Sequence, residues 1–143
     1  MHPERILSSA GPVRVHCLRL HRGDDLLECI RLLCQHKQIQ AGVVLSAVGC
    51  LLSGRVRDAS GVNIRSFEGH YEIVSLNGTV SQQRCHLHIA LSAEDLHTTG
   101  GHLCTGCIIN TTCELVIAEL PGVSYGVEQD AETGYDELIF MPV

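Results

Sequence analysis

The stretch GHYEIVSLNGTVSQQRCHLHIALS, residues 69–92, combines two strand patterns with a turn signal between them. Apolar and polar residues alternate in YEIVSL (71–76) and again in RCHLHIAL (84–91), as expected for half-buried β-strands. Asn77–Gly78 is the dipeptide most typical of a two-residue hairpin, so we predict that the partner strand begins at Thr79. The centre of the protein is therefore expected to be an antiparallel sheet.

Apolar patterns before this stretch extend the sheet and add one clear helix. Residues 13–20 alternate as a strand, and AGVVLSAVGCLL (41–52) is apolar enough for a strand buried on both faces. Between them, apolar residues recur at helical spacing over about 24–37. Asp24 or Asp25 can cap the free N–H groups at the start of this helix.

Smaller signals complete the predicted fold. Gly49, inside the long apolar run, indicates a β-bulge or a close backbone contact. Ser60–Gly61 predicts a turn between two shorter strands, and the polar segment 92–102 is expected to be a loop. Residues 107–120 contain two further strand-like stretches, and the chain should finish with a strand near 137–141.

The composition fits one ordinary globular unit of 143 residues, with 45% apolar and 18% charged residues. No linker, repeat or low-complexity segment divides the chain. We therefore expect a single compact domain over residues 1–143, rich in strands and with one principal amphipathic helix.

Charge and hydropathy exclude several partners. The net charge is −6 and no run of Lys or Arg occurs, whereas duplex DNA is bound chiefly through clustered cations. Nucleic acid is therefore not favoured, although a small patch from Arg55, Arg57 and Arg65 stays open. No 18-residue apolar run or signal-peptide core is present, which favours the cytosol and no membrane partner. The eight cysteines should then be reduced thiols, most of them buried.

The histidines provide the sharpest chemical signal. In a strand, His86 and His88 point to the same face and can lean onto one metal ion. His102 follows Gly100–Gly101, and such a flexible pair can turn the chain back toward that face. Three histidines leave a coordination position open, as in catalytic zinc sites. The alternative, histidines that merely line a polar face and bond to neighbours or solvent, stays open.

Other reactive residues give weaker signals. Cys104 and Cys107 form a C-x-x-C pair, but no second pair completes a zinc site, and a structural role is favoured. Glu72 shares a strand face with His70 and is our candidate general base, with ion pairing or exposure as the alternative. His97 is expected to face solvent or substrate.

The order of motifs resembles the plant-and-prokaryote-conserved (PPC) domain family over about residues 12–140. The strings that carry the resemblance are GDDLLECI, AGVVLSAVGCLLSGRVR, GHYEIVSLNGTVS, HLHIALS, GGHLCTGCI, CELVIAEL and DAETGYDEL. The resemblance implies a compact α/β fold of the α+β type, with a mainly antiparallel β-sheet flanked by helices, that assembles as a homotrimer. Plant members carry an AT-hook before this domain, and their counterpart of GHYEIV contacts partners. No R-G-R-P hook is present here, so the chain resembles the stand-alone form.

The resemblance also implies a function for the histidines. His86, His88 and His102 match a three-histidine zinc site of stand-alone members, similar to that of a metal-dependent ester hydrolase. We therefore expect a cytosolic homotrimer that binds zinc or another divalent metal there and hydrolyses a small-molecule substrate, with Glu72 as base. The alternative is a non-enzymatic module for protein interaction or regulation, with the DNA association that family labels suggest.

Overall fold

The computed structural model describes residues 7–143, which form eight strands and one helix. In chain order the elements are β1 (Arg14–His21), α1 (Leu26–Lys37), β2 (Gly42–Arg57), β3 (Ile64–Val80), β4 (Cys85–Ala93), β5 (Thr98–Leu103), β6 (Ile108–Glu119), β7 (Val123–Gln129) and β8 (Asp136–Pro142). No helix in this described part is long and apolar enough to cross a bilayer.

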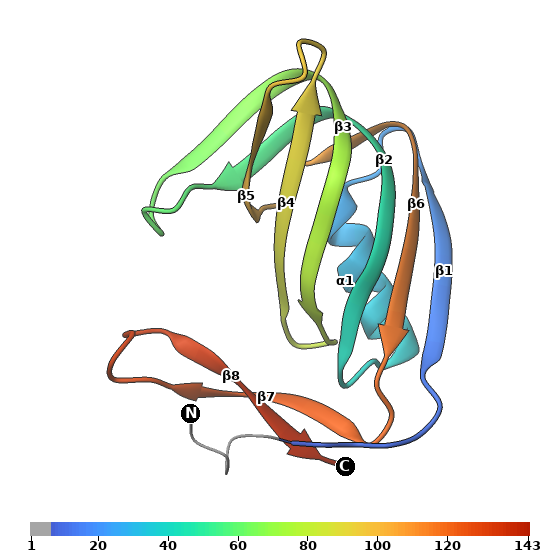
Figure 1. The fold of residues 1–143 in the computed structure, drawn as a ribbon, viewed down its shortest axis with the longest axis vertical. Coiled ribbons are helices and arrows are strands. Elements are labelled where there is room, and N and C mark those ends of the chain that lie inside the picture. Colours follow the sequence, from blue (N-terminus) through green and yellow to red (C-terminus); the bar gives the residue numbers. More distant parts are fainter. Residues whose placement is uncertain (1–6) are drawn as a thin grey trace.

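Six strands form one antiparallel sheet in the order β1-β6-β2-β3-β4-β5. The end of β2 also pairs with β5, where Val56 faces Leu103 and Arg57 faces His102. Strands β7 and β8 form a separate two-stranded ribbon. Figure 1 shows α1 packed on one face of the curved sheet and the ribbon crossing below the sheet's lower end.

Helix α1 forms where the predicted pattern placed it, and Asp25 is its N-cap. One Asp25 carboxylate oxygen accepts a hydrogen bond from the Glu28 N–H at 3.1 Å, and the other accepts one from the Gly106 N–H at 2.6 Å. The cap therefore also ties the helix start to the loop before β6. The helix buries one apolar stripe against the sheet, made of Leu26, Leu27, Ile30 and Cys34.

The predicted hairpin turn at Asn77–Gly78 is wrong, because β3 runs through both residues to Val80. The chain turns instead at residues 81–84, where the Ser81 N–H bonds to the Arg84 carbonyl at 2.7 Å. Gly78 has φ +146°, and a Cβ there would overlap the carbonyl oxygen of His86. The glycine serves a close approach of β3 and β4 rather than a turn.

Several other expectations need correction. The sheet is not flanked by helices in the plural, since α1 is the sole helix of residues 7–143. Residues 107–120 contain one strand, β6, and the polar segment predicted as a loop contains β5. The close contact expected at Gly49 is confirmed, because a Cβ there would overlap the Thr112 carbonyl oxygen. A register shift between β2 and β6 follows directly after it.

The cap of α1 can be tested by replacing Asp25 with alanine. Asp25→Ala leaves the N–H groups of Glu28 and Gly106 without their acceptors, and we expect a loss of about 1–3 kcal/mol in the free energy of unfolding. Urea denaturation measures it. Glu128→Ala, which removes an exposed carboxylate, is the control. Equal stability of the two variants would contradict the assigned role of the cap.

Candidate metal centre

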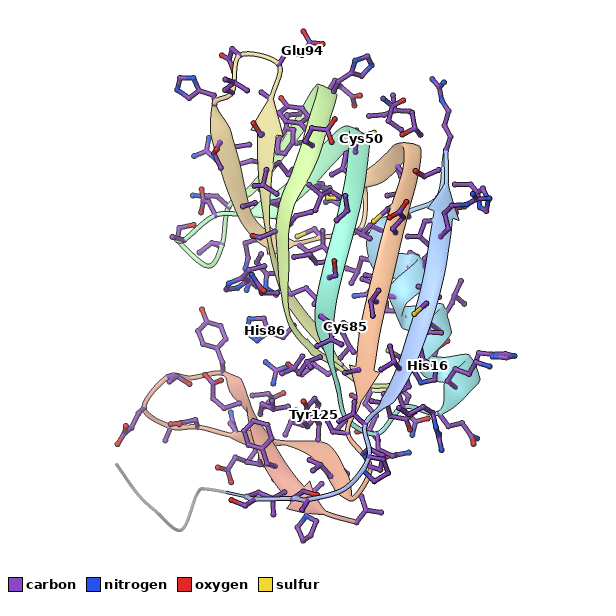
Figure 2. The ribbon with its side chains drawn as sticks, turned by 45° about the vertical axis from the view of Figure 1, so that its right-hand side comes forward. His16, Cys50, Cys85, His86, Glu94 and Tyr125 are labelled. Atoms are coloured by element: carbon purple, nitrogen blue, oxygen red, sulfur yellow. The ribbon has the colours of Figure 1, made fainter. Side chains whose placement is uncertain are left out.

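Strand alternation on β4 places two histidines on the face opposite the core. Leu87, Ile89 and Leu91 are buried, each at most 3% exposed, whereas His86 is half-buried and His88 exposed. Figure 2 shows His86 at the side of the sheet, above the β7–β8 ribbon. The prediction that His86 and His88 share one face is confirmed by this alternation.

Strand β5 adds the third histidine. It runs antiparallel to β4, and in their register His102 lies directly opposite His88. The ring centroids are 5.1 Å apart for His86 and His88, 5.2 Å for His86 and His102, and 5.7 Å for His88 and His102. One ring nitrogen of each histidine lies within 4.8 Å of those of the other two. The structure therefore brings the three predicted ligands together.

The glycines before His102 act differently from our expectation. Gly100 and Gly101 do not turn the chain; they lie within β5, which is held between β4 and the end of β2. A Cβ on Gly100 would overlap the carbonyl oxygen of Ile89, and one on Gly101 would overlap that of Arg57. Only residues without a side chain let β5 approach this closely, and this approach sets the position of His102.

The protonation of the histidines suits metal binding. Burial, followed by the charge of Arg57, lowers the pKa of His102 to about 4. Burial also lowers the pKa of His86, and the charges of His88, Arg84 and Arg57 act in the same direction while Glu137 opposes them. Both rings are therefore neutral at pH 7, the form that coordinates metal ions.

The donor set fits a zinc-type ion. The Nδ1 atom of His102 is buried and has no hydrogen-bond partner among the described residues, which is costly for a polar atom unless a ligand satisfies it. A tetrahedral site with zinc–nitrogen distances of 2.0–2.1 Å requires nitrogens about 3.4 Å apart. The three ligand nitrogens lie within 4.8 Å of one another, which is near that spacing.

The histidines border two hollows. A cavity of about 490 Å³ lies between the sheet and the β7–β8 ribbon, and Arg57, Arg84, His86, His102 and Glu137 are among its lining residues. A more open hollow of about 640 Å³ lies beside β5, and both Arg57 and His102 also line it. The cluster is thus accessible to a small molecule from more than one side.

The structure does not bring Glu72 to the histidines. Glu72 is exposed on β3 opposite Ser92, whereas Asn77 is the β3 residue opposite His88. Those five residues of strand correspond to roughly 16 Å. Within one chain, Glu72 is therefore too far from the histidines to act as their base. A strand pattern predicts the face on which a residue lies, but not its position along the strand. His70 lies at the same end, with its ring 3.5 Å from Glu94.

The remaining sequence candidates also lie outside the cluster. His97 is exposed in the loop between β4 and β5, and its ring lies 3.5 Å from Asp95. Cys107 is fully buried, its thiol donates to the Arg55 carbonyl, and burial raises its pKa to about 11. Cys104 bonds instead to the His102 carbonyl at 3.6 Å. Different partners and a raised pKa support the structural role predicted for this pair.

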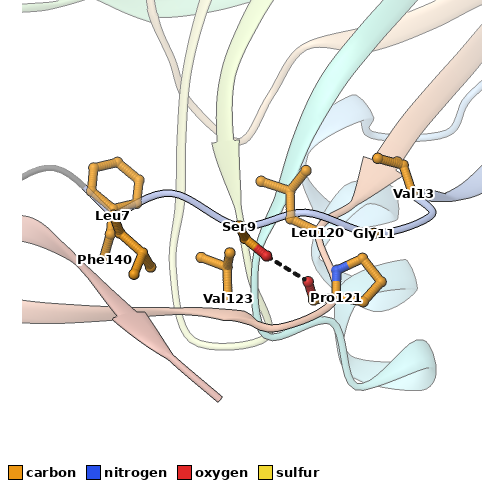
Figure 3. Close-up of a pocket in the computed structure, with 8 residues that line it drawn as sticks. All are labelled: Leu7, Ser9, Gly11, Val13, Leu120, Pro121, Val123 and Phe140. Carbon is orange, nitrogen blue, oxygen red and sulfur yellow. Dashed lines mark hydrogen bonds between the residues drawn. The ribbon is translucent and has the colours of Figure 1, made fainter.

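A separate apolar pocket of about 270 Å³ lies between residues 7–13 and the base of the ribbon (Figure 3). Its lining contains no titratable side chain and consists of Leu7, Ser9, Gly11, Val13, Leu120, Pro121, Val123 and Phe140. Ser9 donates a hydrogen bond to the Pro121 carbonyl at 3.5 Å there. The pocket therefore offers packing surface but no acid, base or metal ligand.

Comparison with protein families identifies the relatives of this chain. The model of the Plants and Prokaryotes Conserved (PCC) domain matches residues 7–121. The chain belongs to this family. A curated relative, the bifunctional protein GlmU of Synechococcus sp. (strain JA-2-3B'a(2-13)), is 37% identical to this PPC chain over 133 residues. That match covers 93% of the chain and 21% of the relative, so the chain spans about a fifth of the relative's length.

Two solved structures support the same fold. A hypothetical protein from Salmonella cholerae-suis superimposes with a TM-score of 0.90 at 34% identity, covering 94% of this PPC chain and 97% of the other. A metal-containing protein from Archaeoglobus fulgidus does so with a TM-score of 0.72 at 28% identity, covering 96% and 99% of the two chains. The family resemblance inferred from the sequence motifs is confirmed.

Sequence reasoning missed the charged residues around the histidines. The sequence patterns place Arg57 only in a possible basic patch and give no role to Arg84 or Glu137. Arg84 directly precedes the strand that carries His86, which was an available signal. Glu137 comes from β8, and no local sequence pattern indicates that it lines the same cavity as the histidines.

The lowered histidine pKa values predict how the stability of the metal-free protein depends on pH. Between about pH 4 and 6.5 the unfolded chain binds more protons at His102 than the folded chain does, so stability falls as pH falls through this window. Urea denaturation with a chelator present, at several pH values, measures the slope. His102→Gln should flatten it, while His97→Gln should not. An unchanged slope in His102→Gln would contradict this assignment.

Proposed function

We propose that this PPC protein binds a zinc-type divalent metal at His86, His88 and His102 and uses it to hydrolyse a small substrate. The observation that carries the proposal is the convergence of three imidazoles, one with a buried nitrogen that has no hydrogen-bond partner among residues 7–143. The metal-containing relative from Archaeoglobus fulgidus supports it. The donors are histidines alone, a set typical of catalytic rather than structural zinc.

The chain's own residues would bind the substrate and transfer the proton. A bound metal would supply Lewis-acid polarisation of the substrate and a more acidic water molecule. The cavity between sheet and ribbon holds the substrate against His86 and His102 and limits its contact with bulk water. Glu137 replaces Glu72 as candidate base, because its carboxylate lines that cavity and its charge acts on His86. It would accept a proton from the attacking water.

Metal content provides the direct test. Protein purified without a histidine tag and dialysed against zinc should retain about one ion per chain in elemental analysis. The triple variant with His86, His88 and His102 changed to alanine should retain none, because these residues form the one cluster of three potential ligands among residues 7–143. His97→Ala is the matched control. Zinc retention by the triple variant, or none in the parent protein, would refute the metal site.

We also propose that the protein is a homotrimer. Leu45 and Val48 on β2 and Val74 on β3 are 56–59% exposed, although these strands lie in the middle of the sheet. Exposed aliphatic side chains on central strands are unusual for a monomer and typical of an interface. If the metal site fails its test, this surface favours the alternative function, a module for protein interaction.

The homotrimer can be tested by placing a charge on this surface. Val48→Glu sets a carboxylate opposite Glu114 and should convert a trimer into monomers, because an unpaired charge is costly at an apolar interface. Light scattering coupled to size exclusion measures the mass. Val62→Glu, at a 79%-exposed loop position, should stay trimeric. A monomeric parent protein would disprove the proposal.

We infer a cytosolic location as well. All eight cysteines are free thiols in the structure, as expected of a protein kept in a reducing compartment. Fractionation of cells that produce the protein tests this inference.

A further inference from the structure

The cavity beside the histidines contains two arginines that the metal chemistry leaves unused. Arg57 ends β2 and lies opposite His102, while Arg84 directly precedes β4. Both line the cavity of about 490 Å³ together with His86 and His102. Two guanidinium groups from strands distant in sequence therefore border the same space as the metal ligands.

Within the described part of the chain, neither arginine has a close acidic partner. Among residues 7–143, no ion pair within 4.0 Å involves Arg57 or Arg84. The Nη1 atom of Arg84 is buried and has no hydrogen-bond partner in this part of the chain. A buried guanidinium nitrogen without an acceptor carries a substantial desolvation cost, which a bound anion would remove.

Acidic groups occupy the opposite wall. Asp136 and Glu137 line the cavity from the β7–β8 ribbon, yet they stay beyond ion-pair distance of the arginines. The positive charge thus lies on the sheet side with the histidines, and the negative charge lies on the ribbon side. A ligand with one anionic end would be oriented with that end toward the sheet.

We propose that Arg57 and Arg84 form an oxyanion subsite, so that the substrate is a small molecule carrying a carboxylate or phosphate group. The planar guanidinium fork suits both groups and binds them through paired N–H donors. This inference rests on the proposed function where it calls the ligand a substrate. The subsite itself needs no metal in order to bind an anion.

The test uses NMR titration of labelled full-length protein, with inorganic phosphate and acetate as separate probes. In the chelator-treated protein, either probe should shift the side-chain N–H signals of Arg57 and Arg84 saturably. Arg84→Gln should raise the Kd about tenfold, since it removes a charge-assisted contact. Arg84→Lys, which keeps the charge but not the fork, should raise it less. Arg57→Gln is the second variant, in case Arg84→Gln does not fold.

Arg19→Gln is the matched control, because it removes the same charge from an exposed position on β1. Its Kd should stay within about twofold of the parent value at constant ionic strength. A response to phosphate alone, or to acetate alone, assigns the preferred oxyanion and supports the subsite. No saturable shift, or equal Kd values in the parent and in folded Arg84→Gln and Arg57→Gln variants, would overturn it.

The outcomes also separate the two proposals. Anion binding that depends on Arg84 in a protein that takes up no zinc would overturn the proposed function and leave the subsite standing. If the protein binds zinc but its anion binding does not depend on Arg57 or Arg84, only the subsite proposal would be overturned.

Discussion

The pairing of β5 with β4 is the constraint on which the candidate site depends. Alternation along β4 places two histidines side by side, but only the antiparallel register sets His102 opposite His88. That register requires β5 to lie close to two neighbouring strands at once, and Gly100 and Gly101 permit it because they lack side chains. Gly78 allows the same close approach on the other side of β4. Backbone packing thus positions the imidazoles before any ligand is present.

The same packing explains the electrostatics. The ribbon covers only part of the strand pair that carries the histidines, so His102 is half-buried. This burial lowers the pKa of His102 enough to keep its ring neutral at pH 7. Arg57 reinforces that neutrality because the pairing of β2 with β5 places it next to His102. One arrangement of three strands therefore explains three features. The imidazoles are neutral, the buried His102 nitrogen has no partner among residues 7–143, and an arginine lies nearby.

Local sequence patterns predicted the parts of this arrangement that depend on local physics. The helix and its Asp25 cap follow from spacing, and the shared face of His86 and His88 follows from strand alternation. The prediction of a turn at Asn77–Gly78 is wrong, because a glycine needed for strand contact looks the same in sequence as one needed for a turn. Glu72 lies far from the histidines along β3 within one chain, because a strand pattern predicts a face but not a distance. Arg57, Arg84 and Glu137 come together only through pairing and packing across the chain, which no window of sequence contains.

The β7–β8 ribbon is a separate two-stranded unit that helps to enclose the cavity beside the imidazoles. It begins at Val123, just beyond the family match that ends at residue 121, and the Tyr125 hydroxyl anchors it to the Gly42 carbonyl. Its far strand supplies the acidic wall facing the imidazoles. Changes in the ribbon would therefore alter one wall of the cavity without breaking any strand pairing in the sheet that carries the imidazoles.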